Sequence, residues 1–284
     1  MLLLKILYKN SGLIKKVSLF VSSILIVFPS CKQSTYLTSN SNNQLNCELG
    51  AIVRGDTLIK TLSLVFTGDE FADGAEHITR VLNEQNVKAS FFFTGNFYRN
   101  PEFQDHIKTL VSDGHYLGAH SDKHLLYCDW KNRDSLLLIQ KEFAEDIENN
   151  YLEMERFGIL KKQTPYFLPP YEWYNDTIST WAKGMGLQLI NFSKGTLSHA
   201  DYTTPKMNNY LNSEKIYQSI VAYEAKNSNG LNGFILLIHI GTDPDRKEKF
   251  YFRLEELIIY LKKKGYKFKS LQELLKKDEA NKKL

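Results

Sequence analysis

A regular alternation of short apolar runs with longer amphipathic segments constrains this chain more than any other feature of its sequence. From about Ile52 onward the apolar runs have the length of strands, and the segments between them carry apolar residues on one side, as helices do. The expected strands are TLSLVF (61–66), KASFFFTG (88–95), YLGAH (116–120), YFL (166–168), LQLINF (187–192), FILLIH (234–239) and YKFKS (266–270). Strands that alternate with helices are joined by crossovers and are therefore parallel. The pattern predicts an α/β fold, a single domain built as a distorted (β/α) barrel of about seven parallel strands.

Helices are expected between these strands. In the first of them, Ile78, Val81 and Leu82 lie on one side, as helical spacing requires. The expected helices cover residues 75–86, 102–114, 134–155, 176–186, about 213–225, 253–265 and 271–277.

The first thirty residues differ from the rest of the chain. They contain no acidic residue, and an apolar run, VSLFVSSILIVF, follows the lysines at positions 5, 9, 15 and 16. A run of about a dozen residues suits the core of a signal peptide better than a membrane-spanning helix of about twenty residues. Residues 1–30 are therefore expected to form a signal peptide.

The end of this segment resembles a bacterial lipoprotein signal. Ser30 directly precedes Cys31, which would become the lipidated first residue of the mature protein. Phe28 and Pro29 depart from the usual residues of such a signal, and an uncleaved anchor is the alternative. The resemblance implies an exported cell-envelope lipoprotein, on the periplasmic side or the cell surface, held to the membrane by a lipid anchor at Cys31.

Residues 31–48 are polar and are expected to form a flexible tether before the barrel domain, residues 49–284. The whole chain has 36 basic and 32 acidic residues, and without the four lysines of the signal the two numbers are equal. This balance does not favour nucleic acid as a partner. Cys47 and Cys128 either pair, as an exported protein allows, or remain separate buried thiols.

Polar and reactive residues follow the apolar runs. Five of the expected strands lead directly into polar segments, namely TGDE, HSDKH, YEWYN, SKGT and HIGTDPD. The carboxyl ends of parallel barrel strands share one face, where active sites are built. Residues far apart in sequence are therefore expected to converge there: Asp69, His120, His124, Glu172 and His239.

The histidines of HSDKH suggest a metal site. Residues four apart lie on the same side of a helical turn, so His120 and His124 can direct their imidazoles at one ion. Asp69, at the end of a neighbouring strand, would be the third ligand and would leave a position open for water. Such an ion lowers the pKa of bound water and polarises a carbonyl. These ligands suit zinc, and nickel or cobalt would fit the same set.

His239 ends the most hydrophobic strand. It is either a core histidine satisfied by a backbone carbonyl or a general acid that protonates a leaving amine, and its position favours the second interpretation. Asp201 could hold this histidine in the required tautomer, or it is an ordinary loop acid.

Taken together, these segments resemble a NodB-like polysaccharide deacetylase of carbohydrate esterase family 4. The resemblance extends from about Leu62 to Leu275, and it is most specific in SDGHYLGAHSDKH, which is similar to the family's segment with two metal-binding histidines. KASFFFTG, FLPPYEW, LLIH and GYKFKSLQELL are similar to other segments of the family. The resemblance implies a distorted barrel, a divalent metal, usually zinc, and removal of N- or O-acetyl groups from a polysaccharide.

Carried over residue by residue, the resemblance assigns roles to four positions. His120 and His124 become metal ligands, and His239 becomes the catalytic acid. Tyr171 would offer its backbone N–H to the oxyanion.

The chain departs from the family at two places. Where the family has the two aspartates of Thr-Phe-Asp-Asp-Gly, an ungapped match places Thr67 and Gly68, and Asp69 follows one residue late, next to Glu70. Leu168 replaces an arginine that orients the family's aspartate base. The loss of the aspartate base together with its arginine is chemically coherent, because an arginine without its carboxylate would be an unpaired charge. Glu172, where the family usually has glycine, is a candidate replacement carboxylate.

Three hypotheses follow. The first is an active metal-dependent deacetylase with Asp69 on the metal and Glu70 or Glu172 as the base. The second is a non-catalytic glycan-binding lipoprotein in which Trp130, Trp173 and Tyr174 stack on sugars. The third is a metal-dependent hydrolase of another amide or ester. Peptidoglycan, chitin-like oligomers, xylan and host or dietary glycans are all compatible with the sequence as the polysaccharide.

Overall fold

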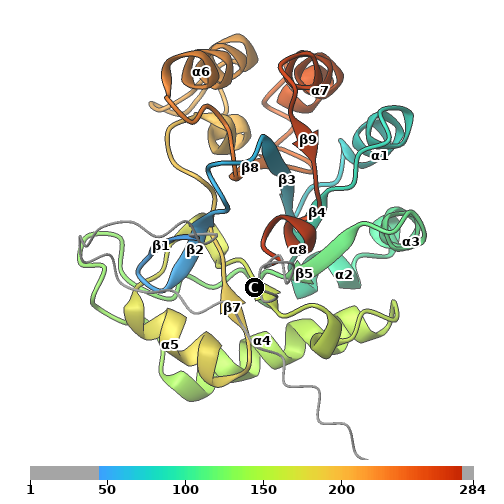
Figure 1. Cartoon of the computed structure of the whole chain (residues 1–284). Helices are drawn as coiled ribbons and strands as arrows, with labels where there is room; N and C mark the ends of the chain where they lie inside the picture. Colours follow the sequence, from blue (N-terminus) through green and yellow to red (C-terminus); the bar gives the residue numbers. More distant parts are fainter. Residues whose placement is uncertain (1–44, 277–284) are drawn as a thin grey trace, which may run out of the picture.

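In the computed structural model, which describes residues 45–276, the chain forms one mixed sheet that curls into a barrel (Figure 1). The order of the hydrogen-bonded strands is β1-β2-β8-β3-β4-β5-β6-β7, and β9 pairs with β3. The strands are β1 (Asn46–Glu48), β2 (Ala51–Arg54), β3 (Thr61–Gly68), β4 (Ser90–Phe93), β5 (Tyr116–Ala119), β6 (Tyr166–Phe167), β7 (Gln188–Leu189), β8 (Phe234–His239) and β9 (Lys267–Phe268).

The pairing confirms the predicted barrel. Strands β3 to β9 each pair in parallel with a neighbour, whereas β2 pairs antiparallel with β1 and β8. A single parallel bridge between Ile52 and Ile190 joins the two sides of the sheet, and Asn191 N–H donates to Ile52 O at 2.9 Å. The barrel is thus distorted, because one bridge rather than a full ladder closes it.

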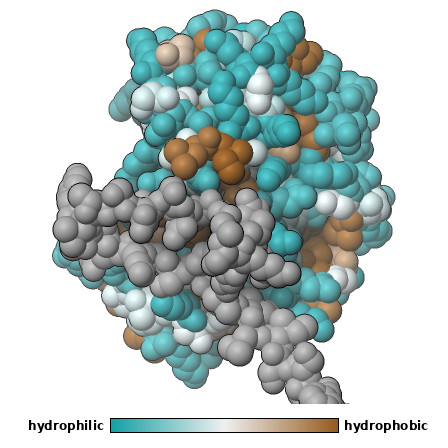
Figure 2. Space-filling view, in the orientation of Figure 1, coloured by the Kyte–Doolittle hydropathy of each residue, from teal (hydrophilic) through white to brown (hydrophobic). Residues whose placement is uncertain are grey.

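Helices surround the sheet, and the short helix α8 lies over its centre in Figure 1. They are α1 (Ala75–Glu84), α2 (Gly95–Arg99), α3 (Gln104–Ser112), α4 (Gln140–Glu155), α5 (Asp176–Gly184), α6 (Ser213–Lys226), α7 (Leu254–Lys263) and α8 (Leu271–Leu274). Leu271 N–H donates to Ser90 Oγ, at the first residue of β4, so α8 covers the amino end of the barrel. The surface on the side viewed in Figure 2 is mainly hydrophilic, with separate hydrophobic patches.

The alternation of side chains along β3 separates two cores. Leu64 and Phe66 belong to the outer core between the sheet and its helices, while Val65 belongs to the cluster inside the barrel. Since side chains alternate with a period of two, Thr67 faces the interior and Gly68 faces the helices. The carboxyl end of β3 therefore presents residue 67, not residue 68, to the barrel mouth.

Several boundaries differ from the prediction. Helix α4 begins at Gln140 rather than at residue 134, because residues 128–136 fold back on themselves through a bridge between Cys128 and Leu136. Of the strand expected over 187–192, only β7 forms, and residues 46–48 of the expected tether form β1. Residues 31–44 of the predicted tether, which include Cys31, and the predicted signal peptide lie outside the described residues.

The structure contradicts the predicted pairing of Cys47 with Cys128, because Cys128 is a buried free thiol. Of the alternative, two separate buried thiols, only the part that concerns Cys128 is confirmed. Within residues 45–276, no helix has the length and apolar character needed to cross a bilayer.

Candidate functional site

A cavity of about 890 Å³ opens at the carboxyl ends of the barrel strands. Most of the predicted site residues line it, namely Asp69, Glu70, His120, His124, Tyr171, Glu172 and His239. Asp201 joins them through hydrogen bonds to His239. The structure thus brings together residues from five separate segments, as expected when parallel strands deliver their carboxyl ends to one face.

His120 and His124 approach each other through a constrained loop and not through the helical turn that their spacing predicts. After β5 the backbone enters the left-handed region at Ser121, with φ 78°, and again at His124, with φ 55°. The centroids of the two imidazole rings lie 5.1 Å apart. Since non-glycine residues rarely hold such conformations without support from their surroundings, the contacts of this loop are informative.

The His120 ring is in the protonation state that a metal ligand requires. Its Nδ1 lies 2.8 Å from Leu168 O, and because a carbonyl only accepts, Nδ1 carries the proton and Nε2 keeps its lone pair. The side chain is buried, and burial together with the nearby His124 lowers the pKa of His120 well below its usual value, although the bond to Leu168 opposes this. The ring is therefore neutral at neutral pH.

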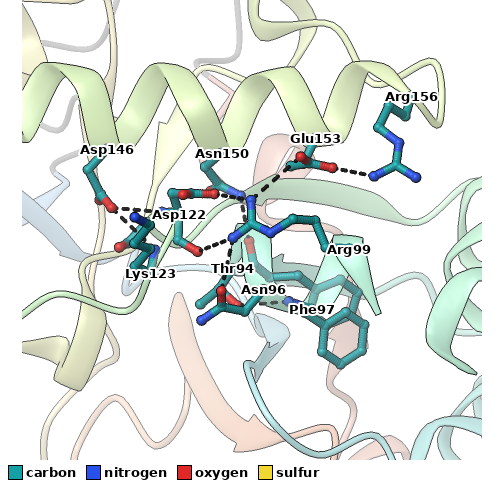
Figure 3. Close-up of polar contacts among 12 residues, drawn as sticks. Thr94, Asn96, Phe97, Arg99, Asp122, Lys123, Asp146, Asn150, Glu153 and Arg156 are labelled. Atoms are coloured by element: carbon teal, nitrogen blue, oxygen red, sulfur yellow. Dashed lines mark hydrogen bonds and ion pairs between the residues drawn. The ribbon is translucent and has the colours of Figure 1, made fainter. Parts of the chain in front are cut away.

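Helix α4 holds the backbone of residues 120–124, here named the histidine loop (Figure 3). Asn150 Oδ1 accepts from His120 N–H at 2.8 Å, and Asn150 Nδ2 donates to Phe93 O at 3.2 Å. Asp146 Oδ1 accepts from the backbone N–H groups of Asp122 and Lys123, at 3.1 and 3.2 Å. Residues four apart share one face of a helix, so Asp146 and Asn150 grip two parts of one loop.

An ion pair fixes the same loop from the side of α2. Arg99 Nη1 lies 2.5 Å from Asp122 Oδ1 and 3.5 Å from Glu153 Oε1, so the arginine bridges the loop and α4. Asp122 is buried, and Arg99 Nη2 also donates to its backbone carbonyl. Figure 3 shows the arginine between the two carboxylates. These contacts account for the persistence of the strained loop.

Replacing Asn150 by alanine is expected to lower the free energy of unfolding by about 1–3 kcal/mol, because it leaves the buried His120 N–H without an acceptor. Chemical denaturation measures this change. Asn149→Ala is the matched control, since Asn149 is exposed on the same helix and its loss should cost no more than about 0.5 kcal/mol. Equal values for the two variants would contradict the positioning role of Asn150.

Asp69 follows β3, and its neighbours orient its carboxylate. Thr94 Oγ1 donates to Asp69 Oδ1 at 2.7 Å, and Asn96 Nδ2 donates to the same oxygen at 3.3 Å. The other oxygen, Oδ2, lies 3.9 Å from His124 Nδ1. Glu70, the next residue, is exposed. Of these two acids, Asp69 is the one that faces the histidines.

Gly68 cannot be the position of a ligand. A Cβ at residue 68 would lie 2.7 Å from Ile240 Cγ2 and 2.9 Å from Phe97 Cε2, in the packed layer between the sheet and the helices. An aspartate in the ungapped position would therefore point away from the cavity. This geometry explains why the acid nearest the histidines stands one residue later.

The fit of a divalent cation rests on donor type. His120 Nε2 has a free lone pair, and Asp69 Oδ2 faces His124, so two imidazoles and a carboxylate of the kind that zinc prefers line the cavity together. As the side chains stand, no three His, Cys, Asp or Glu residues between 45 and 276 converge on one point. The donor atoms are therefore of the right type for a divalent cation. The three side chains would have to move closer together to coordinate one ion.

His239 and Asp201 form a close pair beside these residues. His239 Nδ1 donates to Asp201 Oδ1 at 2.6 Å, and His239 N–H donates to Asp201 Oδ2 at 2.9 Å. Burial lowers the pKa of His239, but the carboxylates of Asp201 and Glu172 outweigh it, and the pKa lies above the usual value. With its proton on Nδ1 held by Asp201, the ring turns Nε2 to its other side as the exchangeable position.

Glu172 lies in the same electrostatic environment. Burial raises the pKa of Glu172 to about 7, with His239 lowering it and Asp201 raising it further. Tyr171 and Glu172 both have left-handed backbone conformations, with φ 58° and 54°, and Asn191 Nδ2 donates to Glu172 O at 2.9 Å. A carboxyl group that titrates near pH 7 can take up and release a proton under physiological conditions.

Leu168 and Thr67 occupy the two positions where the chain departs from the resembled family. Leu168 is fully buried in the cluster inside the barrel, so this position holds no charge that needs a partner. Thr67 pairs with His239 in the β3–β8 ladder, and its buried hydroxyl has no hydrogen-bond partner among the described residues. Besides Asp201, the carboxylate whose charge raises the pKa of His239 is that of Glu172, from the segment that follows β6.

Sequence reasoning missed the residues that support the site. Asp146 and Asn150 gave no signal, since a polar residue in an amphipathic helix normally faces solvent. Thr94, the N-cap residue of α2, gave none either. His199 was also missed; it lines the cavity and stacks on Phe192, with ring centroids 4.4 Å apart.

Comparison with known proteins agrees with this geometry. The family model described as polysaccharide deacetylase matches residues 54–190. The chain is 26% identical over 219 residues to a peptidoglycan-N-acetylglucosamine deacetylase of Bacillus cereus, covering 76% of this chain and 89% of the relative. It is 26% identical over 235 residues to a peptidoglycan-N-acetylmuramic acid deacetylase of Bacillus subtilis, covering 82% and 78%.

Solved structures share the fold. A CE4 family pseudoenzyme from Bacillus anthracis has a TM-score of 0.62 and 19% identity, covering 81% of this chain and 70% of that one. The chitin deacetylase of the fungus Colletotrichum lindemuthianum has a TM-score of 0.59 and 20% identity, covering 78% and 90%.

Proposed function

Because this chain belongs, through residues 54–190, to the polysaccharide deacetylase family, we propose that it is a metal-dependent hydrolase that removes acetyl groups from an N- or O-acetylated polysaccharide. The observation that carries the proposal is the position of the His239–Asp201 pair and Glu172 in the same cavity as His120, His124 and Asp69. An acid, a base and three donors suited to a cation are the parts that such a hydrolysis needs.

His120, His124 and Asp69 would hold the cation. When bound, a zinc, nickel or cobalt ion would polarise the acetyl carbonyl and lower the pKa of a bound water molecule. Asn150, Asp146, Thr94 and Asn96 would keep these ligands in place, since they bind the histidine loop and the Asp69 carboxylate.

The remaining residues would move the protons. Glu172, as a carboxylate, accepts a proton from water while the water oxygen adds to the acetyl carbonyl. The protonated His239 then gives a proton to the leaving nitrogen or oxygen as its bond to the acetyl carbon breaks, which releases acetate. Asp201 keeps the His239 proton on Nδ1 and stabilises the charged ring. The backbone N–H of Tyr171 would stabilise the oxyanion.

Peptidoglycan is the first substrate to test, since two relatives of 26% identity are named for deacetylation of its sugars. A substrate in the cell envelope agrees with the export and the lipid anchor at Cys31 expected from the amino-terminal segment.

Metal removal tests the proposal. Treatment of the protein with a strong chelator is expected to abolish acetate release from acetylated glycan fragments, and addition of zinc or cobalt ions should restore it, because the ion carries several kcal/mol of transition-state stabilisation. Enzymatic detection of free acetate measures the rate, and metal analysis of the protein measures loading. Undiminished release from protein shown to be free of metal would contradict the mechanism.

A second candidate, a non-catalytic glycan-binding protein on the same barrel, is favoured by one observation. The three proposed ligands do not converge as they stand, and Thr67 and Gly68 replace the usual acids. Oligosaccharide binding that is unaffected by chelator, with no acetate released from any acetylated glycan, would establish this alternative.

A further inference from the structure

We propose that Trp130, Tyr171 and Trp173, here named the aromatic shelf, bind sugar rings of the substrate chain next to the unit that carries the acetyl group. This inference rests on the proposed polysaccharide substrate and adds a binding site to it. Trp130 and Trp173 take no part in the proposed mechanism. Tyr171 takes part only through its backbone N–H, so its side chain is free to bind a sugar ring.

The shelf is a continuous series of rings that leads away from the histidines. The ring centroids of His124 and Tyr171 are 4.4 Å apart, those of Tyr171 and Trp130 are 5.4 Å apart, and those of Trp130 and Trp173 are 5.5 Å apart. All four side chains line the same cavity. A sugar chain with one unit at the histidines would therefore meet the shelf with its next units.

The shelf is open to solvent although it is aromatic. Trp130 is 54% exposed and Tyr171 is 43% exposed. Large aromatic side chains usually bury most of their surface, and several exposed aromatic side chains in contact with one another, with polar residues around them, are typical of a binding site. Lys123 and Arg133 line the cavity here, and neither forms an ion pair within residues 45–276. Faces of pyranose rings that carry C–H groups, bordered by hydroxyls, suit such a surface.

Contacts behind the shelf hold it in place before any ligand binds. The Arg133 guanidinium carbon lies 4.0 Å from the Trp173 ring centroid, and Trp173 Nε1 donates to Asp129 O at 3.2 Å. Arg133 Nε donates to Tyr174 O at 2.5 Å, and Asn175 Nδ2 donates to Arg133 O at 2.8 Å. Preorganised aromatic groups lose little conformational entropy on binding, and Trp, Tyr and Arg are the residues enriched in energetic hot spots.

Chain-length dependence of binding tests the shelf. Isothermal titration calorimetry on chelator-treated protein would use N-acetylglucosamine oligomers, glycan fragments of peptidoglycan and acetylated xylan oligomers, each as two-unit and five-unit chains. For the chain type that binds, Trp130→Ala is expected to weaken the five-unit ligand about 10- to 30-fold and the two-unit ligand less than threefold. Trp130→Phe should recover most of the affinity. Phe252→Ala is the matched control, because Phe252 is 59% exposed and does not line the cavity.

Equal losses for short and long chains, no loss in Trp130→Ala, or no binding of any chain by the unmodified protein would overturn the proposal. Because binding is measured without turnover, its outcome is separate from that of the proposed function. If the protein binds long chains through Trp130 but releases no acetate, the proposed shelf holds and the proposed deacetylase function is wrong. If the protein releases acetate, and Trp130→Ala does not alter how release depends on chain length, the deacetylase assignment holds and the shelf is ruled out.

Discussion

Replacing His120 and His124 together by alanine is expected to lower the rate of acetate release by at least about 10³-fold. The two imidazoles are the nitrogen donors of the proposed cation site, and without them the several kcal/mol that a cation supplies to the transition state is lost. The fold should survive, because Asn150 and Asp146 bind the backbone of this loop and not the imidazoles. Acetate release and bound metal are measured on the same samples, and a denaturation curve checks the fold.

His106→Ala provides the control for this double variant. His106 lies on α3 and does not line the cavity, so its loss should leave both the metal content and the rate unchanged within about twofold. Retention of full activity by the double variant would show that the histidines take no part in the reaction.

Glu172→Gln is expected to lower kcat by about 10²- to 10⁴-fold, the usual contribution of general acid–base catalysis. Glutamine keeps the size of the side chain but cannot accept the proton of the attacking water. In the unmodified protein the rate should rise with pH through about 7, as Glu172 loses its proton, and fall at higher pH, as His239 loses its own. In Glu172→Gln, the rise of the rate with pH near 7 should disappear. Loss of activity in Glu70→Gln, with Glu172→Gln active, would assign the base to Glu70.

The stability of the same variant gives an independent measurement. Burial raises the pKa of Glu172 from 4.5 to about 7, so the folded state holds its proton more tightly than the unfolded state does. This carboxyl group therefore stabilises the fold fully below about pH 4.5, and the contribution is lost as pH rises to about 7. Relative to the unmodified protein, Glu172→Gln should gain on the order of 1–3 kcal/mol between pH 4.5 and pH 8. Urea denaturation of both proteins at both pH values measures the difference, and the same stability difference at pH 4.5 and pH 8 would contradict the raised pKa of Glu172.

The carboxyl-end rule predicted the position of the residues at strand ends correctly, whereas no pattern in the sequence indicated the residues that support them. His239 ends an unbroken apolar run, and Asp69 follows another, so the carboxyl-end rule places both at the barrel mouth. The spacing of His120 and His124 predicts their proximity but suggests a helical turn, whereas the structure has a loop with two left-handed residues. Asn150 lies thirty residues beyond His120, and no local pattern links the two.

Hydrophobic periodicity is a local property, and the sequence by itself therefore determined the alternation of strands and helices, the parallel barrel and the segments that reach its mouth. Only the tertiary structure decided which side chains face the cavity. It directs Gly68 toward Ile240 and Phe97, buries Leu168 inside the barrel, and places Glu172 near His239. These outcomes depend on the direction of each side chain and on packing between segments distant in the chain, which no short stretch of sequence contains.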